Sequence, residues 1–497
     1  MFTYVSPAEA GVSAKQIQKY IQVLEKHGIE THDIILARGN QIFFEQYWSP
    51  LNADFPHRMY SATKSYVAIA VGFAIQDGLV ALDDKVVDYF PEDVPENVLE
   101  HVRNQTVRNM LMMSTGYVQS CGNWFADQED RVKFYFQKNT EPVTSSNEFS
   151  KIPGTFFDYD STGSFILGAL VERVTKKGLN EYLREKLFDK IGVSDKVRFL
   201  KCPGGHTWGD SALICTALDF LKVARFTLNY GSWNGEQILS KEYLMDATSD
   251  LISTGEEDNS KSFGYGYQIW RTWNNSFFFN GACSQLAVCV PDKDIIMVYN
   301  GFNDAMNEII FRFFEEIVET ASDEPIVEDE ETQESLEAYC KTLELKHIKK
   351  NVPTGMQEKV NGRTYWLNDN PMGITTVRLD FSGDKGMFTY ENAQGLKKLE
   401  FGICHNVPSV FPQEGYSGEV GALYAPGNYY KCQVSAGWLE ERKFRIVARI
   451  LDDYLGGFRF TFYFVDEDKV AFLSTGGGEN FGKEYRGYAE GSYEKAD

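Results

Sequence analysis

Apolar side chains recur at helical intervals along most of the first 320 residues. The spacing over 12–28 places the apolar residues on one face and predicts a helix there. The same pattern predicts further helices at 107–117, 163–176, 180–190, 216–229 and 307–317. We expect Gly116 to end the first of these. The run 66–75 differs because it is apolar almost all round, which is typical of a helix buried in the centre of a domain.

Short apolar runs bounded by turn residues lie between these helices. Residues 33–44 predict two strands joined by a hairpin turn at Gly39-Asn40. Further strands are predicted to start within 263–270 and to cover 277–281, 285–290 and 295–300. A sheet of hairpin-connected strands with helices packed apart from it indicates an α/β or α+β layered domain.

The pattern changes after residue 320. Residues 322–331 form an acidic run around Pro325, which is typical of a solvated linker. Beyond residue 360, alternating segments replace the helical periodicity, at 364–367, 375–379, 386–390, 398–401, 429–434, 444–450, 457–464 and 469–473. About eight strands at regular spacing predict a small antiparallel barrel. We therefore expect a layered domain over 1–320, an acidic linker over 321–340 and an all-β barrel over 341–497.

Composition narrows the classes of function. The chain has 497 residues, more than one core usually supports, so two or more domains are expected. The formal net charge of −22 argues against nucleic acid as a partner and gives no support for binding to anionic membranes. The N-terminus lacks the pattern of a secretory signal, and the run 66–75 is too short to span a bilayer. The eight cysteines contain no C-x-x-C pair, which predicts reduced thiols, no metal framework and a cytoplasmic location.

The candidate chemistry lies where the buried run begins, at Ser61-Ala62-Thr63-Lys64. Positions i and i+3 are neighbours on one helix face, so Ser61 Oγ and Lys64 Nζ can meet. A serine hydroxyl becomes a strong nucleophile when a base takes its proton. A lysine amine is such a base when burial or a neighbouring positive charge disfavours its ammonium form. The S-x-x-K pattern also occurs at 382–385 and 492–495, but neither opens a buried helix, and we interpret both as chance.

Three further motifs follow in order along the chain. They are Leu111…Ser114-Thr115-Gly116, then Pro153-Gly154-Thr155-Phe156 with Tyr159 and Ser161 after it, then a Gly281 strand followed by Val290-Pro291-Asp292. This order resembles the class C β-lactamase family of serine hydrolases, which also includes D-alanyl peptidases and esterases. The resemblance covers most of residues 6–316. It implies a β-lactamase/transpeptidase-like fold, in which an antiparallel sheet is flanked by helices and accompanied by an all-helical region.

The resemblance also implies roles for individual residues. Ser61 is the expected nucleophile, Lys64 its activator and Tyr159 a proton relay between them. Ser161 stands where the family has Asn in its Tyr-x-Asn motif, so a hydroxyl replaces an amide donor. Asn280-Gly281 stands where the family has Lys-Thr-Gly or His-x-Gly, so the cation that meets a substrate carboxylate is missing. We expect these three residues to orient a neutral ester, amide or small peptide.

An oxyanion hole needs two backbone N–H groups near the reacting carbonyl. We expect one from Ser61, at the N-terminus of the helix, and the other from Ala282 on the strand edge, with Cys283 as the alternative. No histidine lies near Cys283 in sequence, so we interpret its thiol as packing, and we interpret His57 and His206 as loop histidines. Three aromatic residues are further candidates to line the pocket: Tyr117, Trp124 and Trp208.

Together these features predict a serine hydrolase that acts through an acyl-enzyme, without a cofactor or metal. Its expected partner is a small-molecule or short-peptide substrate, and homo-oligomerisation stays open. The C-terminal barrel is similar in pattern to the lipocalin-like domain of some family members, and would cap the site or mediate oligomers. Two alternatives remain. One is a β-lactamase or D-amino-acid peptidase proper, and the other is a catalytically degenerate binding protein on the same scaffold.

Overall fold

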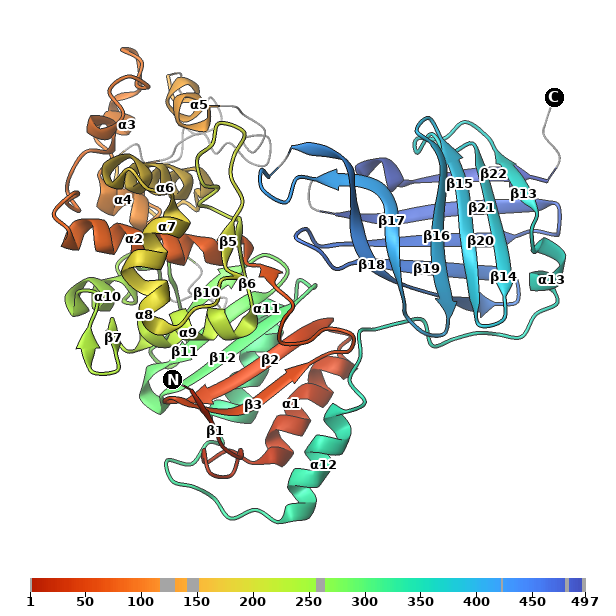
Figure 1. Cartoon of the computed structure of the whole chain (residues 1–497), viewed down its shortest axis with the longest axis horizontal. Helices are drawn as coiled ribbons and strands as arrows, with labels where there is room; N and C mark the ends of the chain where they lie inside the picture. Colours follow the sequence, from red (N-terminus) through yellow and green to blue (C-terminus); the bar gives the residue numbers. More distant parts are fainter. Residues whose placement is uncertain are drawn as a thin grey trace. The chain divides into compact units, whose positions relative to one another are not determined.

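The computed structural model describes residues 2–116, 130–140, 152–255, 264–421, 423–478 and 482–493 (Figure 1). The chain divides into two compact units. Unit 1 comprises Met1–Glu344 together with Gly418–Gly421, and unit 2 comprises Leu345–Ser417 and Ala422–Asp497. Among the described helices, none has both the length and the apolar character needed to cross a membrane.

A seven-stranded sheet forms the centre of unit 1. Its strands, in spatial order, are β1 (Thr3–Tyr4), β3 (Gln41–Tyr47), β2 (Thr31–Arg38), β12 (Ile295–Gly301), β11 (Gln285–Val290), β10 (Ser276–Gly281) and β9 (Trp270–Thr272). All neighbours are antiparallel except β1 and β3. The predicted hairpin over 33–44 and the predicted strands at 277–281, 285–290 and 295–300 are therefore confirmed. The strand predicted within 263–270 begins only at Trp270, because Gln268 adopts a left-handed φ of 58° that ends the extended backbone before it.

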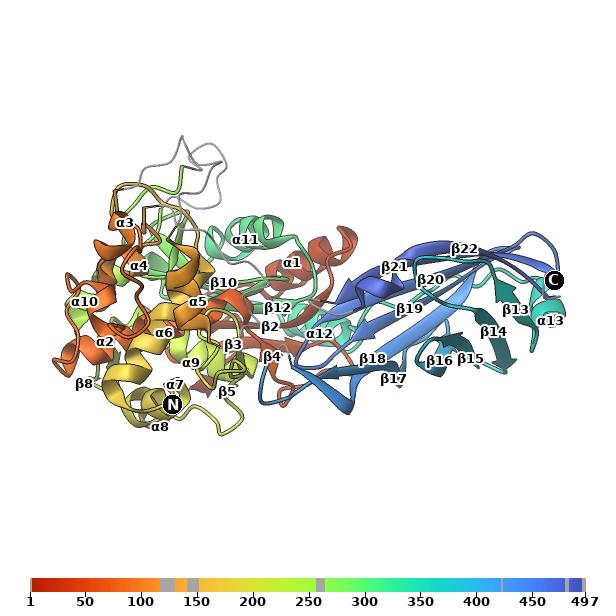
Figure 2. The ribbon, with the colours of Figure 1, turned by 90° about the horizontal axis from the view of Figure 1, so that it is seen from above.

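Helices cover both faces of this sheet. Tyr20 of α1 (Ala14–Lys26) donates its hydroxyl hydrogen to Met297 Sδ of β12. On the other face, Cys289 of β11 lies 3.8 Å from the carbonyl oxygen of Ala224 in α9 (Ala217–Leu228). Cys289 pairs with Ile296 of β12, so these two side chains lie on the same face of the sheet. Met297 is the next residue of β12 and points to the opposite face, because side chains alternate along a strand. Figure 2 shows α11 (Met306–Phe313) beside α1.

The acidic stretch after residue 320 belongs to unit 1, which differs from the predicted linker over 321–340. It contains α12 (Glu330–Cys340), which packs beside α1 with Leu336 buried (Figure 1). Just before α12, the carboxylate of Glu328 accepts hydrogen bonds from Ser13 Oγ at 2.5 Å and Ala14 N–H at 3.0 Å. A negative charge is favourable at a helix N-terminus, and Glu328 lies at that of α1. The acidic stretch therefore contributes a capping interaction to unit 1 and is not only a solvated segment.

The remaining elements of unit 1 form the predicted helical region and small sheets. The helices are α2 (Thr63–Gln76), α3 (Glu100–Arg103), α4 (Val107–Leu111), α5 (Arg131–Lys138), α6 (Ser161–Thr175), α7 (Leu179–Leu183), α8 (Asp189–Ile191) and α10 (Lys241–Ala247). The short 3-10 helices are η1 (Tyr60–Ala62), η2 (Val86–Tyr89) and η6 (Pro291–Lys293), and the π-helical segments are η4 (Arg184–Phe188) and η7 (Phe314–Val318). The short strands are β4 (His57–Arg58), β5 (Arg198–Phe199), β6 (Leu213–Cys215), β7 (Ser232–Trp233) and β8 (Glu236–Gln237). As predicted, α2 is buried from Thr63 to Ala74.

The helix predicted at 107–117 ends earlier than Gly116. Helix α4 stops at Leu111, and Met113 takes the left-handed conformation with a φ of 52°. The N–H of Ser114 then donates to the carbonyl of Asn109 at 2.9 Å, and that of Met113 to the carbonyl of Met110 at 3.3 Å. This is the Schellman arrangement of a helix C-terminus, here formed without glycine.

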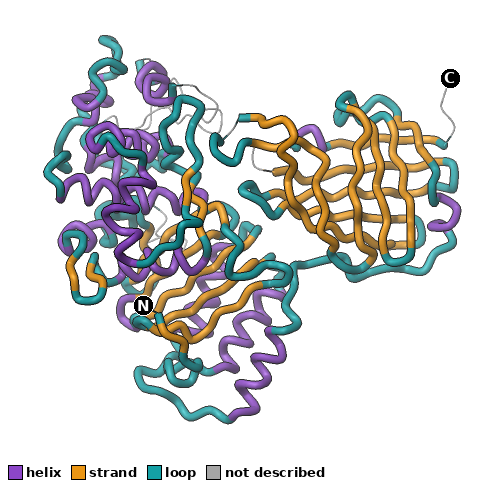
Figure 3. Tube along the Cα trace, viewed as in Figure 1, coloured by secondary structure: helices purple, strands orange, loops and turns teal. Residues whose placement is uncertain are grey.

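Unit 2 consists almost entirely of strands (Figure 3). They are β13 (Thr364–Leu367), β14 (Thr376–Ser382), β15 (Lys385–Asn392), β16 (Gly395–Ile403), β17 (Val407–Tyr416), β18 (Tyr424–Glu440), β19 (Lys443–Ile450), β20 (Gly456–Phe464), β21 (Lys469–Gly478) and β22 (Gly487–Ser492), with α13 (Met356–Val360) and η8 (Lys483–Tyr485). The sheet closes into a barrel where β16 pairs with β18 at Gly402↔Ser435 and Ile403↔Ala436. The predicted barrel is confirmed, and each of the eight predicted strands is present, but β17 and β22 were not predicted.

Candidate active site

Ser61 and Lys64 lie together at the start of α2. Tyr60, with a φ of 45°, turns the chain into η1, and α2 follows directly after Ala62. Lys64 Nζ donates hydrogen bonds to Ser61 Oγ at 3.0 Å and to the carbonyl oxygen of Asp210 at 2.7 Å. Lys64 is only 1% exposed. Within the described parts of the chain, no ion pair of Lys64 with a carboxylate is found, so its buried amine faces a hydroxyl and a carbonyl instead of a counter-ion.

Tyr159 lies beside the same amine. Lys64 Nζ is 5.2 Å from the centre of the Tyr159 ring. The ring of Tyr159 also stacks on that of Trp270, with ring centres 5.6 Å apart and planes inclined by 24°. Trp270 also contacts Phe157 and Tyr265, at ring-centre distances of 5.6 and 4.9 Å. Burial, together with the nearby Tyr159, raises the pKa of Tyr265 well above its usual value, so Tyr265 stays a neutral part of this aromatic cluster.

Asp160 and Ser161 connect Tyr159 to α6. The carboxylate of Asp160 accepts the N–H groups of Thr162 at 2.9 Å and Gly163 at 3.0 Å, and thus caps the helix. Burial raises the pKa of Asp160 to about 6, although these hydrogen bonds oppose the shift. Ser161 is the first residue of α6, and its part in orienting a substrate stays a prediction.

The end of β10 approaches the chain just before Ser61. A Cβ atom on Gly281 would fall within 3.0 Å of the carbonyl oxygen of Met59, closer than real Cβ atoms come, so only glycine fits here. The turn that follows contains Cys283 and Ser284, with φ values of 62° and 66°. Ser284 Oγ fixes this turn by donating to Asn303 Oδ1 at 2.9 Å. The close approach brings the Ala282 turn towards the nucleophile segment, and the oxyanion role of Ala282 stays a prediction.

Asn280 is half-buried at the end of β10, where it pairs with Leu286. Strand β10 reads Ser-Phe-Phe-Phe-Asn-Gly and carries no basic side chain. The cation of the family motif is therefore missing from this strand, and the part of Asn280 in orienting a substrate stays a prediction.

The aromatic residues that were candidates for the pocket have different places. Trp208 is buried next to two guanidinium groups, with Arg58 Cζ at 4.8 Å and Arg131 Cζ at 4.6 Å from its ring centre. Tyr117 and Trp124 lie outside the described residues. Whether any of the three lines a substrate pocket stays a prediction.

The two histidines that the sequence singled out, His57 and His206, each have a carboxylate neighbour. His57 is buried, with Nε2 at 3.2 Å from His32 Nδ1 and Nδ1 at 3.5 Å from Asp33 Oδ2. Burial lowers the pKa of His57 well below its usual value and raises that of Asp33 to about 8, so this pair is neutral at neutral pH. His206 Nδ1 lies 2.8 Å from Glu172 Oε2.

Gln268 is a structural residue that the sequence patterns did not indicate. It is buried, and its Nε2 donates to the carbonyls of Met110 at 2.8 Å and Leu111 at 3.0 Å. Its Oε1 accepts from Ser164 at 2.5 Å and its carbonyl accepts from Ser65 at 2.8 Å. One glutamine therefore joins α2, α4 and α6, the helices that adjoin the first three predicted motifs.

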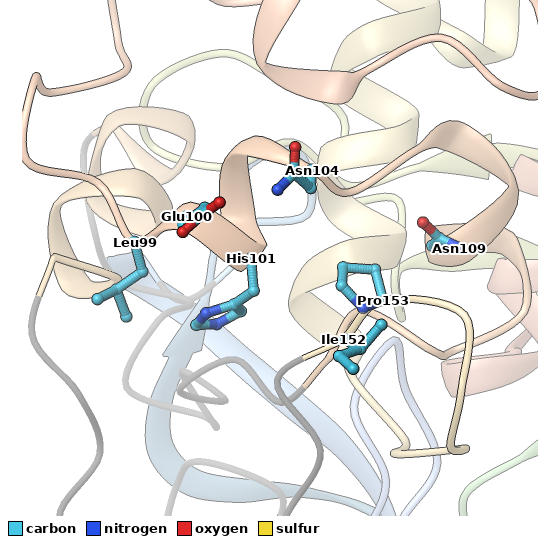
Figure 4. A pocket seen from close by; sticks show the side chains of 7 residues that line it. All are labelled: Leu99, Glu100, His101, Asn104, Asn109, Ile152 and Pro153. Carbon is cyan, nitrogen blue, oxygen red and sulfur yellow. The ribbon is translucent and has the colours of Figure 1, made fainter.

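A cavity of about 600 Å³ borders the loop that leads to Tyr159 (Figure 4). It is lined by Leu99, Glu100, His101, Asn104, Asn109, Ile152 and Pro153. None of these is Ser61, Lys64 or Tyr159, so this cavity is distinct from the Ser61–Lys64 site.

Comparisons with known proteins identify the family of the chain. The family model described as Beta-lactamase matches residues 17–307. The 6-aminohexanoate-dimer hydrolase of Paenarthrobacter ureafaciens is 23% identical over 287 residues, which are 54% of this chain and 72% of that protein. Esterase EstB of Burkholderia gladioli is 25% identical over 184 residues, 35% of this chain and 45% of that protein. The octameric penicillin-binding protein homologue from Pyrococcus abyssi has a similar fold over 96% of this chain and 99% of its own, with a TM-score of 0.51 and 16% identity. Because the family model covers more than half of its residues, this chain belongs to the Beta-lactamase family.

Proposed function

We propose that the protein is a serine hydrolase that acts through an acyl-enzyme on an ester, an amide or a small peptide. The observation that carries this proposal is the hydrogen bond from Lys64 Nζ to Ser61 Oγ at 3.0 Å, in a buried setting where no carboxylate of the described chain pairs with the amine. A nucleophile and a base within hydrogen-bond reach are the common feature of activated serines. The relatives named as a dimer hydrolase and an esterase support the same class of reaction.

The proposed reaction has two halves. Ser61 Oγ attacks the substrate carbonyl while its proton passes to the Lys64–Tyr159 pair. The N–H groups of Ser61 and Ala282 hold the negative oxygen of the tetrahedral intermediate. The leaving alcohol or amine then takes the proton, which leaves Ser61 acylated. Water attacks this ester with help from the same pair, the acid departs and the Ser61 hydroxyl is restored.

The residues of the β10 edge favour a substrate without a carboxylate beside the reacting carbonyl. A carboxylate in a partly buried site needs a cation or several donors to offset its lost hydration. Asn280 and Ser161 offer neutral donors only. A β-lactamase or D-amino-acid peptidase proper is the second candidate, and the family match supports it.

Activity-based labelling tests the proposal. The protein is treated with a fluorophosphonate or a penicillin probe, digested and analysed by mass spectrometry. We expect the fluorophosphonate on Ser61, no labelling of a Ser61→Ala variant, and hydrolysis in a panel of neutral esters and amides. Faster labelling by penicillin than by fluorophosphonate favours the β-lactamase alternative. A folded protein whose Ser61 reacts with neither probe refutes the enzyme and leaves a binding protein on this scaffold.

A further inference from the structure

One carboxylate fastens the loop between β5 and β6, which supplies the carbonyl of Asp210 to the site lysine. Glu172 on α6 accepts the N–H of Thr207, at 3.2 Å to Oε1 and 3.4 Å to Oε2, and also accepts its hydroxyl. Its Oε2 lies 2.8 Å from His206 Nδ1, and its Oε1 accepts the N–H of Leu179 at 3.3 Å. The Glu172 side chain is only 12% exposed, so these bonds replace most of its hydration.

The same loop is held by close packing one residue before Asp210. A Cβ on Gly209 would lie 3.2 Å from Val67 Cγ2, and a Cβ on Gly168 would lie 3.7 Å from the Cα of Gly209. Val67 is one turn after Lys64 on α2, and Gly168 is one turn before Glu172 on α6. The backbone that carries the Asp210 carbonyl therefore lies between the nucleophile helix and the helix of Glu172.

We propose that Glu172 is a positioning residue, which holds this loop so that the Asp210 carbonyl directs Lys64 Nζ towards Ser61 Oγ. This inference rests on the proposed function. Helix α6 begins directly after Tyr159 and Asp160 and contains Glu172 in its last turn. One helix therefore connects Tyr159, the proposed proton relay, with Glu172, the residue that binds the loop. Without the carboxylate, Thr207 and His206 lose their acceptor, the carbonyl shifts, and the amine loses the partner that fixes its direction.

The kinetic test uses Glu172→Ala and Glu172→Gln, with Glu181→Ala, an exposed carboxylate on α7, as the matched control. The rate of fluorophosphonate labelling of Ser61, per folded molecule, is measured between about pH 6 and about pH 10. We expect Ser61 of Glu172→Ala to be labelled ~10–100-fold more slowly and with a displaced pH profile. The reason is that a displacement of about 1 Å between reacting groups lowers a rate by roughly this factor. The glutamine variant keeps one acceptor oxygen and is expected to recover part of the rate. A Glu172→Ala protein that is less stable but labels with the wild-type rate and pH profile overturns the inference.

Hydrogen–deuterium exchange gives a readout that does not depend on activity. The amides of Trp208 and Ala212, which donate within the loop to the carbonyls of Leu200 at 2.9 Å and Trp208 at 3.2 Å, are expected to exchange faster in Glu172→Ala. Unchanged exchange at these amides overturns the inference. A wild-type protein that no probe labels counts against the proposed function instead, and the exchange result still decides whether Glu172 holds the loop.

Discussion

The substitution Gly281→Ala tests whether the end of β10 is part of the active site. An added Cβ would lie about 1 Å closer to the carbonyl oxygen of Met59 than the 3.0 Å that real Cβ atoms keep, and 3.0 Å from the Cβ of Gln285. The Met59 carbonyl belongs to the main chain two residues before Ser61, so it cannot rotate away as a side chain would. Gln285 is held by the hydrogen bond from its Nε2 to the carbonyl of Gly301 at 2.7 Å. The strand end and η1 must therefore separate by about 1 Å, which moves the Ala282 N–H away from the carbonyl that Ser61 attacks.

The expected loss follows from this displacement. A misplacement of about 1 Å costs ~100-fold in rate, and removal of one oxyanion donor costs ~100–1,000-fold. We therefore expect kcat for a good ester substrate to fall by at least ~100-fold, equal to about 2.7 kcal/mol of transition-state stabilisation. Overpacking of this kind costs about 1–3 kcal/mol of stability, which leaves most of the protein folded.

Ester hydrolysis and circular dichroism measured on the same preparations separate the two effects. Gly355→Ala is the matched control, because its Cβ would meet nothing within 4 Å and its φ of −72° suits alanine. We expect this control to keep the wild-type kcat. A folded Gly281→Ala protein with the wild-type kcat would refute the reasoning, since the β10 end could then not form the oxyanion hole.

Further predictions concern the two proton-handling residues, a buried carboxyl group and the barrel core. Lys64→Met and Tyr159→Phe are each expected to lower kcat by ~100–10,000-fold, and full ester hydrolysis by either variant would remove that residue from proton transfer. Asp33 binds a proton when folded up to about pH 8, whereas the unfolded chain releases it near pH 4, so the Asp33 contribution to the pH–stability curve of the wild-type protein is expected to fall by on the order of 4 kcal/mol between about pH 4 and pH 7. Asp33→Asn is expected to flatten that curve in urea denaturation, and parallel curves would contradict it. Phe388→Ala, at a fully buried barrel position, is expected to cost about 3–5 kcal/mol in urea denaturation of the full chain, and a loss below about 1 kcal/mol would contradict a packed interior.

The sequence allowed most strands of the barrel to be predicted, and the exceptions have physical reasons. β17 contains Pro408 and Pro412, which lack the N–H of a ladder and hide the alternating pattern. It nevertheless forms because it lies at the end of the sheet order and pairs with β18. β22 is short and includes Gly487 and Gly491, which weaken any strand signal. The helix α12 was hidden by its acidic composition, because a charge run is usually a solvated face.

Within the candidate site, the sequence indicated contacts that depend on local spacing. Ser61 and Lys64 meet because they are one turn apart, and this follows from helical geometry alone. The carbonyl of Asp210 carries no side-chain pattern, although it binds the same amine. Gln268 and Glu172 act through backbone groups of segments far apart in the chain. Such partners become visible only when the fold brings those segments together.

Aromatic side chains pack against one another inside the barrel of unit 2. The ring of Phe388 lies 5.2, 5.3 and 6.0 Å from those of Phe460, Phe462 and Phe472, distances at which aromatic rings are in direct contact. The hydroxyls of Tyr485 and Tyr390, which are both buried, share a hydrogen bond at 2.8 Å. Side chains thus fill this part of the barrel, as in small barrels that enclose a packed core. The likeness to lipocalin-like domains is therefore one of strand closure, because in this part of the interior aromatic side chains pack against one another.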